Sequence, residues 1–179
     1  GIQTSGNSNI ANLDISRIKI SSELGSSTTN IGGLIGMAEN PIISNVNIED
    51  VKIEANETNT IGGVIGIVTK AQYSNASTSN LIISNVNITK LEEDSNSITA
   101  AHALHGGILL GFGSIKTDNI NISDVNINIS QRALSIGTIG TVGIEGENEI
   151  KNITLQNSEI TGYLYVGGIV GNNPSNSPI

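Results

Sequence analysis

The chain contains two histidines whose type and spacing could support metal binding or catalysis. His102 and His105 lie three residues apart in the run Ala-His-Ala-Leu-His. A zinc protease of the HExxH type needs two histidines four residues apart on one helix, with a glutamate beside the first as general base. Neither feature is present. We therefore interpret both histidines as solvated or capping residues, and adventitious metal binding with a nearby carboxylate is the alternative.

Acidic residues gather in two places. One is the run Glu92-Glu93-Asp94, and the other is the stretch from Gly143 to Glu149, which carries Glu145, Glu147 and Glu149. Calcium prefers several oxygen ligands on alternate positions of a loop that contains glycine. The second stretch has glycines and alternating glutamates but matches no defined calcium loop. We interpret both clusters as solvated turns and expect no metal or cofactor site.

Two further sets of side chains could contact a glycan. A glycosidase needs two opposed carboxylates, and Asp14, Asp50 and Asp124 are candidates only if turns of the chain bring two of them together. Tyr163 and Tyr165 are two residues apart, so on a strand both would point to one face. They form a stacking platform for a sugar or peptide, or they close the last turn of the fold. We assign no catalytic residue.

The composition predicts an all-β protein with an aliphatic core. Hydrophobic residues make up 37% of the 179 residues, aromatic residues only 2%, and tryptophan is absent. Isoleucine and valine are stiff at χ1 and fit a pleated surface better than a helix. There are no cysteines, which excludes thiol nucleophiles and thiolate metal sites. Secreted eukaryotic domains of this size more often carry disulfides, so a bacterial surface protein is favoured.

The charge balance also limits the partners. Sixteen acidic residues against eight basic ones give a net charge of −8, which disfavours nucleic acid and anionic membranes. No apolar run reaches the roughly 18 residues of a membrane helix, and no signal-peptide pattern follows Gly1. We expect a monomeric piece of a longer chain.

A repeated unit organises the chain. It has the form I-x-N-Φ-x-Φ, where Φ is aliphatic, and its copies begin near Ile10, Ile43, Ile83, Asn119 and Ile150. The copy at Ile83 repeats the copy at Ile43 letter for letter (Ile-Ser-Asn-Val-Asn-Ile). We take as anchors the asparagines at 12, 45, 85, 119 and 152, which gives spacings of 33, 40, 34 and 33.

A second unit, rich in glycine, alternates with the first. Its clear copies are Ile31–Gly36, Ile61–Gly66 and Val166–Gly171. The copy His105–Gly111 has one residue more, and the copy Ile136–Gly140 has Thr138 in place of the second glycine, which leaves its backbone path open. First glycines at 32, 62, 106, 137 and 167 give spacings of 30, 44, 31 and 30. Two alternating motifs with a period near 30 predict a repeat architecture.

Alternation of apolar and polar residues identifies the units as strands. Val46, Ile48, Val51 and Ile53 should be buried, with a bulge or bend at Glu49-Asp50. Because one unit cannot bury its apolar face alone, we expect successive units to stack into a parallel β-helix with stacked asparagines at a turn. We expect right-handed winding, surface insertions at 71–80 and 91–97, and either a helical turn or a loop at 97–104.

The Gly-Gly-Φ-Φ-Gly unit followed by Ile-x-Asn resembles the GLUG repeat of bacterial surface proteins. The residues that carry this resemblance are Gly32–Gly36 with Ile43–Asn45, Gly62–Gly66 with Ile83–Asn85, and Gly167–Gly171. The repeat is typical of non-catalytic regions of M26 metallopeptidases, the immunoglobulin A1 protease group, and similar repeats occur in adhesins.

The resemblance implies a β-solenoid over residues 1–171, with about five repeats, and a polar tail over 172–179. It implies an extracellular or cell-surface module without catalytic activity, whose parent is a zinc metallopeptidase involved in virulence. The module would serve as a spacer or as a surface that binds a host protein or glycan, such as immunoglobulin A. The alternatives are the stalk of a bacterial adhesin and, less favoured, a polysaccharide-active β-helix enzyme.

Overall fold

The protein is a parallel β-solenoid, seen in a computed structural model that describes residues 2–22, 30–55, 60–69, 75–90, 104–129, 133–143, 147–162 and 164–173. All regular structure in these ranges is β-strand, which confirms the predicted fold class. The strands are β1 (Ile2–Ser22), β2 (Asn30–Gly32), β3 (Ile35–Ala55), β4 (Thr60–Gly62), β5 (Ile65–Val68), β6 (Ser77–Lys90), β7 (Leu104–Gly113), β8 (Lys116–Ser123), β9 (Asn126–Asn128), β10 (Ala133–Val142), β11 (Glu149–Ile150), β12 (Ile153–Gln156), β13 (Glu159–Thr161), β14 (Tyr165–Val166) and β15 (Val170–Asn172).

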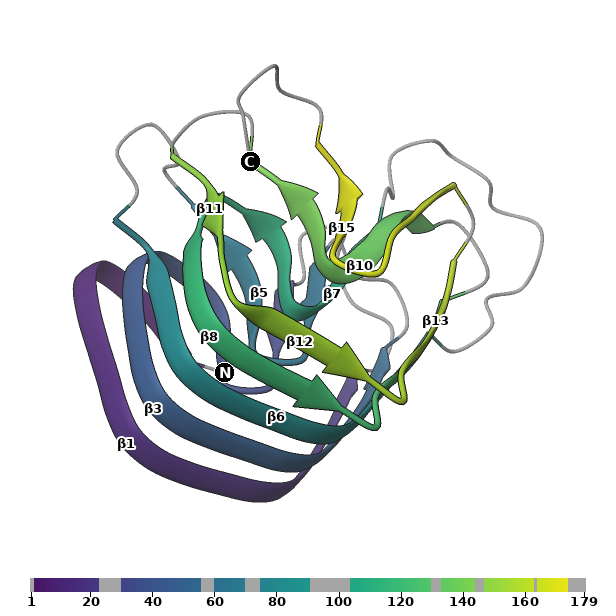
Figure 1. Ribbon diagram of the computed structural model, residues 1–179, viewed down its shortest axis with the longest axis horizontal. Coiled ribbons are helices and arrows are strands. Elements are labelled where there is room, and N and C mark those ends of the chain that lie inside the picture. Colours follow the sequence, from purple (N-terminus) through teal and green to yellow (C-terminus); the bar gives the residue numbers. More distant parts are fainter. Residues whose placement is uncertain are drawn as a thin grey trace.

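Every strand pairing between these elements is parallel, so the chain climbs one level with each turn. The long strands β1, β3, β6 and β8 stack in that order, and β11 and β12 stack on β8. Figure 1 shows them wrapping around the outside of the profile, with β5, β7 and β10 inside the curve. The chain makes about four turns. Right-handed winding stays a prediction.

The glycine units form two short arms that fold back on each other inside this curve. A Cβ built at Gly62 would lie 1.7 Å from the carbonyl oxygen of Ile65 in the opposite arm, and one at Gly66 would lie 2.6 Å from the carbonyl oxygen of Ile31. The arms therefore touch backbone to backbone, and only glycine allows this approach. We call this contact the glycine seam.

Two bends shape each long strand, and a residue with positive φ lies at each of them. The first corner column contains Asn12, Asn45, Asn80, Asn119 and Asn152, and the second contains Arg17, Asp50, Asn85, Asp124 and Asn157. Their φ values lie between 46° and 58°, in the left-handed region that asparagine and aspartate tolerate best among residues with a side chain. The predicted bend at Glu49-Asp50 is thus confirmed.

The register corrects the predicted anchor in the third turn. Ser44 pairs with Ser79 and Val46 with Leu81, so Asn80 lies over Asn45, whereas Asn85 lies over Asp50. The spacings at the first corner are therefore 33, 35, 39 and 33, from positions 12, 45, 80, 119 and 152. The letter-for-letter copy was misleading because both corners of a turn use the same local pattern, five residues apart.

The third glycine unit is corrected in the same way. Gly107 pairs with Gly62, and Gly106 takes the place of Ile61, so this copy has the same length as the first, second and fifth copies. The equivalent glycines are 32, 62, 107, 137 and 167, spaced by 30, 45, 30 and 30. The fourth copy is one residue shorter, because Gly137 pairs with Gly107 whereas Ile139 pairs with Leu110, so the register shifts at Thr138. The backbone N–H and the hydroxyl of Thr138 both donate to the carbonyl of Gly168.

Two predicted boundaries also change. Residues Ser77–Asn80, expected in an insertion, begin β6, and Asn172, expected in the tail, ends β15 and pairs with Thr141. The candidate helical turn at 97–104 and the insertion at 91–97 lie outside the described residues, except Leu104, which begins β7.

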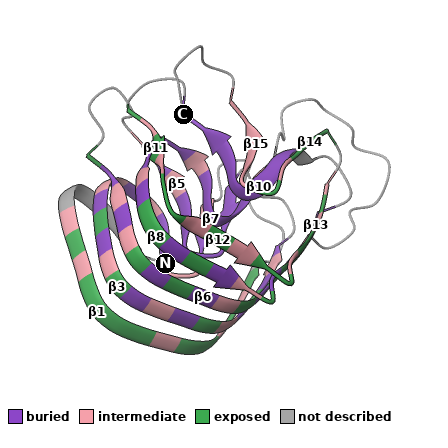
Figure 2. Cartoon of the chain, in the orientation of Figure 1, coloured by how far each residue is buried: buried purple, intermediate pink, exposed green. Residues whose placement is uncertain are grey.

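The core is a continuous aliphatic column inside the turns. Val46, Ile48, Val51 and Ile53 are all at most 1% exposed, as their alternation predicted. Each stacks on its equivalent in the next turn, so that Ile48 lies over Ile83 and Ile53 over Ile88. Figure 2 shows buried and exposed residues alternating along β3, β6 and β8, while residues 8–21 of β1 and all of β12 are intermediate or exposed.

Candidate functional site

The outer end of the glycine seam brings together two columns of side chains. One arm contributes Asn30, Thr60, His105, Ser135 and Tyr165, and the other contributes Met37, Ile67, Phe112, Thr141 and Asn172. The first column is largely polar and the second becomes polar only in the last turns. Among the residues singled out from the sequence, this seam holds His105 and Tyr165.

His105 is the centre of a small polar cluster. Its Nδ1 lies 2.9 Å from Oγ of Ser135 and 2.7 Å from Oγ1 of Thr141, and these two hydroxyls also bond to each other. The ring lies against Phe112 with centroids 5.1 Å apart. Burial lowers the pKa of His105 below its usual value. The predicted solvated or capping role is therefore wrong, because His105 is a half-buried, hydrogen-bonded histidine.

A histidine beside a serine hydroxyl is the arrangement of a general base and a nucleophile. It can act on a substrate only if the substrate can reach the hydroxyl. Ser135 is 0% exposed and Thr141 is 1% exposed, so a substrate cannot reach either hydroxyl in this conformation. Thr60, one level away, donates to Oδ1 of Asn30 at 2.8 Å instead of joining the histidine. The cluster satisfies buried polar groups that would otherwise destabilise the seam.

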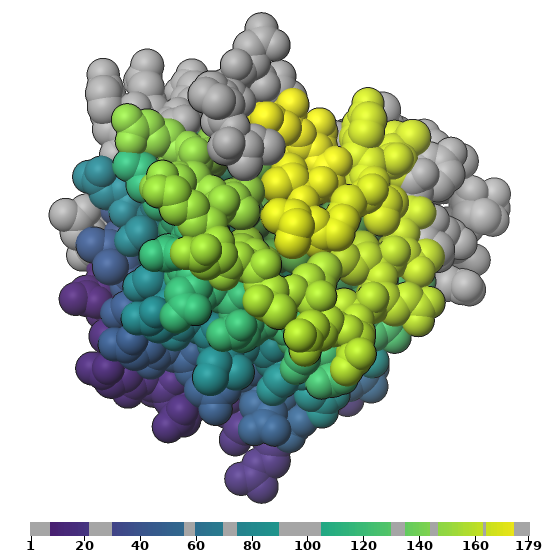
Figure 3. Space-filling view, viewed as in Figure 1, coloured from purple at the N-terminus to yellow at the C-terminus, as the bar shows by residue number. Residues whose placement is uncertain are grey.

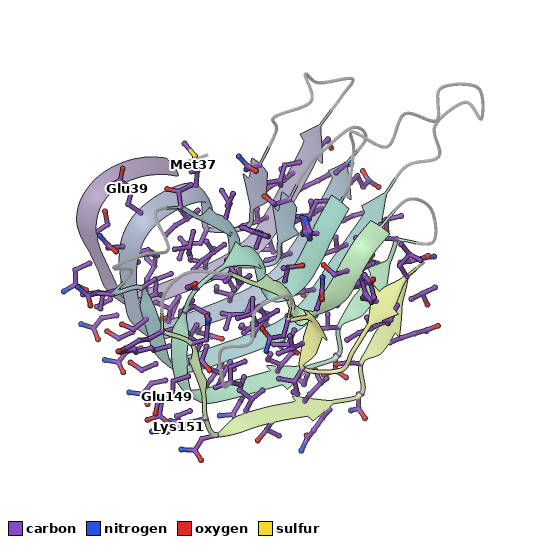
Figure 4. The ribbon with its side chains drawn as sticks, turned by 90° about the horizontal axis from the view of Figure 1, so that it is seen from above. Met37, Glu39, Glu149 and Lys151 are labelled. Atoms are coloured by element: carbon purple, nitrogen blue, oxygen red, sulfur yellow. The ribbon has the colours of Figure 1, made fainter. Side chains whose placement is uncertain are left out.

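Metal-ligating side chains do not converge in the described residues, where no group of three or more His, Asp or Glu could hold an ion. His102, Glu145 and the run Glu92-Glu93-Asp94 lie outside those residues. The remaining glutamates of the acidic turn form exposed ion pairs, Glu147 with Lys116 and Glu149 with Lys151. Figure 4 shows Glu149 and Lys151 side by side on the outer surface of the last turn.

The electrostatics of the acidic turn fit a structural turn. The ammonium of Lys116 holds the pKa of Glu147 below its usual value, and Glu147 in return raises the pKa of Lys116. The side chain of Asn148 accepts the N–H of Ile115 at 3.0 Å and donates to the carbonyl of Gly143. The bond from Ile115 ties the turn to the preceding level.

The candidate glycan-binding side chains are dispersed. Asp50 and Asp124 share the second corner column, but Asn85 lies between them and donates to Asp50. Asp14 lies in a different column with Asn47. Tyr165 is 51% exposed beside Leu164 and Val166 in the last turn, and Tyr163 lies outside the described residues.

The most regular polar feature of the surface is a pair of corner ladders. At the first corner the amide nitrogen of Asn45 donates to Asn12, that of Asn80 to Asn45, and that of Asn119 to Asn80. At the second corner Asn85 donates to Asp50 and Asn157 to Asp124. The sequence pattern predicted the first ladder with one wrong member and missed the second. Asn or Asp five residues after the corner asparagine, present in every turn but the first, where Arg17 stands, was a usable signal.

Comparison with protein-family models, with curated proteins and with solved structures found no match to this chain. The class of the protein rests on its geometry. It is a parallel β-solenoid with an aliphatic core, a glycine seam and polar corners. Within the described residues, no helix has the length and apolar character needed to span a bilayer.

Proposed function

We propose that this chain is a non-catalytic structural module, a rigid spacer in a large bacterial cell-surface protein. The observation that carries the proposal is that the long strands from β1 to β12 stack without a register shift from Asn7 onward, around one aliphatic core. A rod of this kind has a length fixed by its number of turns, because each level adds about 4.8 Å. The likeness of its motifs to the GLUG repeat supports the cell-surface setting.

The outer surface also fits a spacer. Its columns are made mainly of Asn, Ser, Thr and charged side chains, and the ion pairs of Lys52 with Glu54 and of Lys151 with Glu149 are exposed. Among the described residues of the middle turns, the large apolar side chains that are exposed are Ile42 and Ile82. A spacer needs a soluble lateral surface of this kind, and scattered apolar residues need no partner.

Rigidity can be measured directly, because the chain has no cysteine of its own. Asp14→Cys and Thr154→Cys lie in one column, four levels apart. Their backbones should therefore be about 19 Å apart. With spin labels at both sites, and unlabelled protein in excess to remove distances between molecules, electron–electron resonance should give one narrow distance peak. A broad distribution would rule out a rigid spacer.

The resemblance to the immunoglobulin A1 protease group supports a second role for the same module, that of a surface for a host protein or glycan. Interferometry with immobilised immunoglobulin A1 and a panel of glycans tests it. Saturable binding that is lost in a variant of the exposed Tyr165 would show that the module binds a partner as well as acting as a spacer. Absence of binding at high concentration leaves the spacer role alone. Release of product from a glycan would instead favour the enzyme alternative.

A further inference from the structure

A tripeptide that can accept a sugar recurs along the surface of the solenoid. The pattern Asn-x-Ser or Asn-x-Thr is the acceptor for asparagine-linked glycosylation. Within the described residues it begins at Asn75, Asn87, Asn121 and Asn152. Of these copies, those at Asn87 in β6 and Asn121 in β8 lie within strands. Their middle residues belong to the core, so the asparagine and the hydroxyl residue both point outward.

The copy at Asn87 has polar surroundings. In its column Asn87 lies between Lys52 and Asn126. Its side-chain oxygen accepts a hydrogen bond from the hydroxyl of Thr89 at 3.0 Å. Nothing apolar therefore adjoins this asparagine in its column.

The copy at Asn121 has an apolar neighbour instead. Ile82 of β6 pairs with Asn121 of β8, and the Ile82 side chain is 54% exposed. This is the largest exposure of any large apolar side chain in the described middle turns. Paired residues on adjacent strands lie about 4.8 Å apart. Asn121 is itself exposed, so its amide nitrogen is open to solvent directly beside this isoleucine.

Short polar side chains complete a flat ledge around these two residues. Ser84 pairs with Ser123 in the next outward column of β6 and β8, and both are partly buried. A sugar ring has a face made of C–H groups and an edge of hydroxyl groups. Ile82 offers an apolar contact to the face, and the two serines offer hydrogen-bond partners to the edge. Figure 3 shows β6 and β8, in teal to green, at the surface between the first turn in purple and the last turn in yellow-green.

We propose that Asn121 carries an asparagine-linked sugar whose first ring covers Ile82. This goes beyond the spacer role and adds a covalent modification to the lateral surface of the solenoid. A single exposed isoleucine requires no partner. Its place beside an acceptor asparagine, on a ledge of short hydroxyl side chains, is what points to a sugar.

The transfer is a substitution at the anomeric carbon of the sugar. The donor carries this carbon on a diphosphate, which is attached to a nucleoside or to a lipid. A bond forms between the anomeric carbon and Nδ2 of Asn121, and the bond from that carbon to the phosphate oxygen breaks. A base of the transferase takes one amide proton. The products are glycosylated Asn121 and the diphosphate carrier.

Transfer precedes the folding of this turn. β8 is hydrogen-bonded to β6 on one side and to β12 on the other, so the folded acceptor cannot leave the sheet to enter a transferase. After folding, Ile122 is 1% exposed while Asn121 stays outside. The sugar therefore does not obstruct the stacking of the turns.

The first test is peptide mass mapping of the chain isolated from the cells that naturally produce it. The peptide with Asn121 should carry a single sugar, which indicates a nucleoside diphosphate donor, or an oligosaccharide, which indicates a lipid-linked donor. Asn47 is an outward asparagine of the same column without the acceptor pattern, and its peptide should be unmodified. An unmodified Asn121 would overturn the proposal.

Variants made in the same cells test the acceptor pattern. Ser123→Ala keeps Asn121 but removes the hydroxyl, and it should abolish the added mass. Ser123→Thr restores the hydroxyl and should retain the added mass. The matched control Asn47→Gln should leave it unchanged. A sugar that persists on Asn121 in the Ser123→Ala variant would contradict the assignment.

The contact with Ile82 is tested by methyl NMR of the protein with the sugar and of the Asn121→Gln variant without it. The Ile82 methyl resonances should shift and show nuclear Overhauser contacts to sugar protons. Ile42, which is 38% exposed in another column, should be unchanged. A sugar on Asn121 without contacts to Ile82 would overturn the proposed covering. None of these readouts uses the resonance distance that tests the spacer role, so the two proposals can fail separately.

Discussion

The third turn and the first turn are built from the same repeat but differ in what covers them. In β6 the inward residues Leu81, Ile83, Val86 and Ile88 are at most 1% exposed. In β1 the inward residues Leu13, Ile15, Ile18 and Ile20 occupy the same columns and are all partly exposed. The third turn has a neighbour on each side, and the first turn has one. The burial of a residue in this fold is therefore set by its neighbours as much as by its own turn.

This difference has a consequence for stability. In a solenoid each turn contacts only its neighbours, so stability is close to a sum of turn and interface terms. A substitution in a middle turn disturbs two interfaces, and the same substitution in an end turn disturbs one. Matched variants in one column can measure that difference.

The largest effect is expected from a charge in the middle of the core. Ile83→Asp places a carboxylate among Ile48 and Ile122 with no cation in reach, and should cost about 4 kcal/mol of unfolding free energy. Ile15→Asp lies in the same column of the partly exposed first turn and should cost much less. Chemical denaturation measures both. Equal losses would mean that the two turns are equally buried.

The glycine seam should give the next largest effect. Gly62→Ala puts a Cβ 1.7 Å from the backbone oxygen of Ile65, and should cost about 3 kcal/mol because backbone must move. Gly168→Ala, at the next glycine position and not in the column of Gly62, meets only the end of the Leu155 side chain at 3.9 Å; it should be almost neutral and serves as the control for a glycine substitution outside the close contact. Thermal unfolding of the two variants compares them. A neutral Gly62→Ala would contradict the closeness of the arms.

The corner ladder should contribute less. Asn45→Ala loses amide bonds to both Asn12 and Asn80 and puts alanine at a φ of 53°, so a loss of about 2 kcal/mol is expected. Asn45→Gly keeps the backbone relaxed and should recover about half of it. Asn152→Ala loses only its bond to Asp118 in the last turn and should cost less than Asn45→Ala. Denaturation curves that rank these variants differently would contradict the ladder.

The smallest effect is a pH dependence from His105. Burial holds its folded pKa below its usual value, so the unfolded chain binds more protons at acid pH. The contribution of neutral His105 is complete above about pH 6.5 and is lost as the pH falls toward the lower folded pKa. His105→Gln should flatten the decline in unfolding free energy between pH 7 and 5. If the two curves stay parallel, the histidine is not buried as described.

The fold class could be predicted because the period-two pattern and the 30-residue period are properties of single turns. The stacking register could not, since Ile43–Ile48 and Ile83–Ile88 have identical letters yet occupy different corners. Each turn contains the corner pattern twice, and only contact between turns decides which copy stacks on which. Gly106 was misassigned for a similar reason. Two adjacent glycines look alike in sequence, but only at Gly107 would an added Cβ lie 1.9 Å from a backbone oxygen, that of Leu110.

The candidate site shows the same limit. His105 was conspicuous by its type, but its partners Ser135 and Thr141 lie 30 and 36 residues further along the chain. One period of the repeat separates them, so they meet through stacking and not through a local motif. The acidic turn, by contrast, was interpreted from adjacent residues, and its described glutamates are exposed and paired with lysines as a solvated turn requires.

The stacking register is the central claim, and one disulfide experiment tests it most directly. Asn47 pairs with Ile82, so Asn47→Cys with Ile82→Cys should oxidise to a disulfide in the folded protein. The register suggested by the identical letters would instead pair Asn47 with Asn87, five residues away. A disulfide in the 47–82 variant and free thiols in the 47–87 variant are the expected results. The reverse would show that the turns stack in the other register.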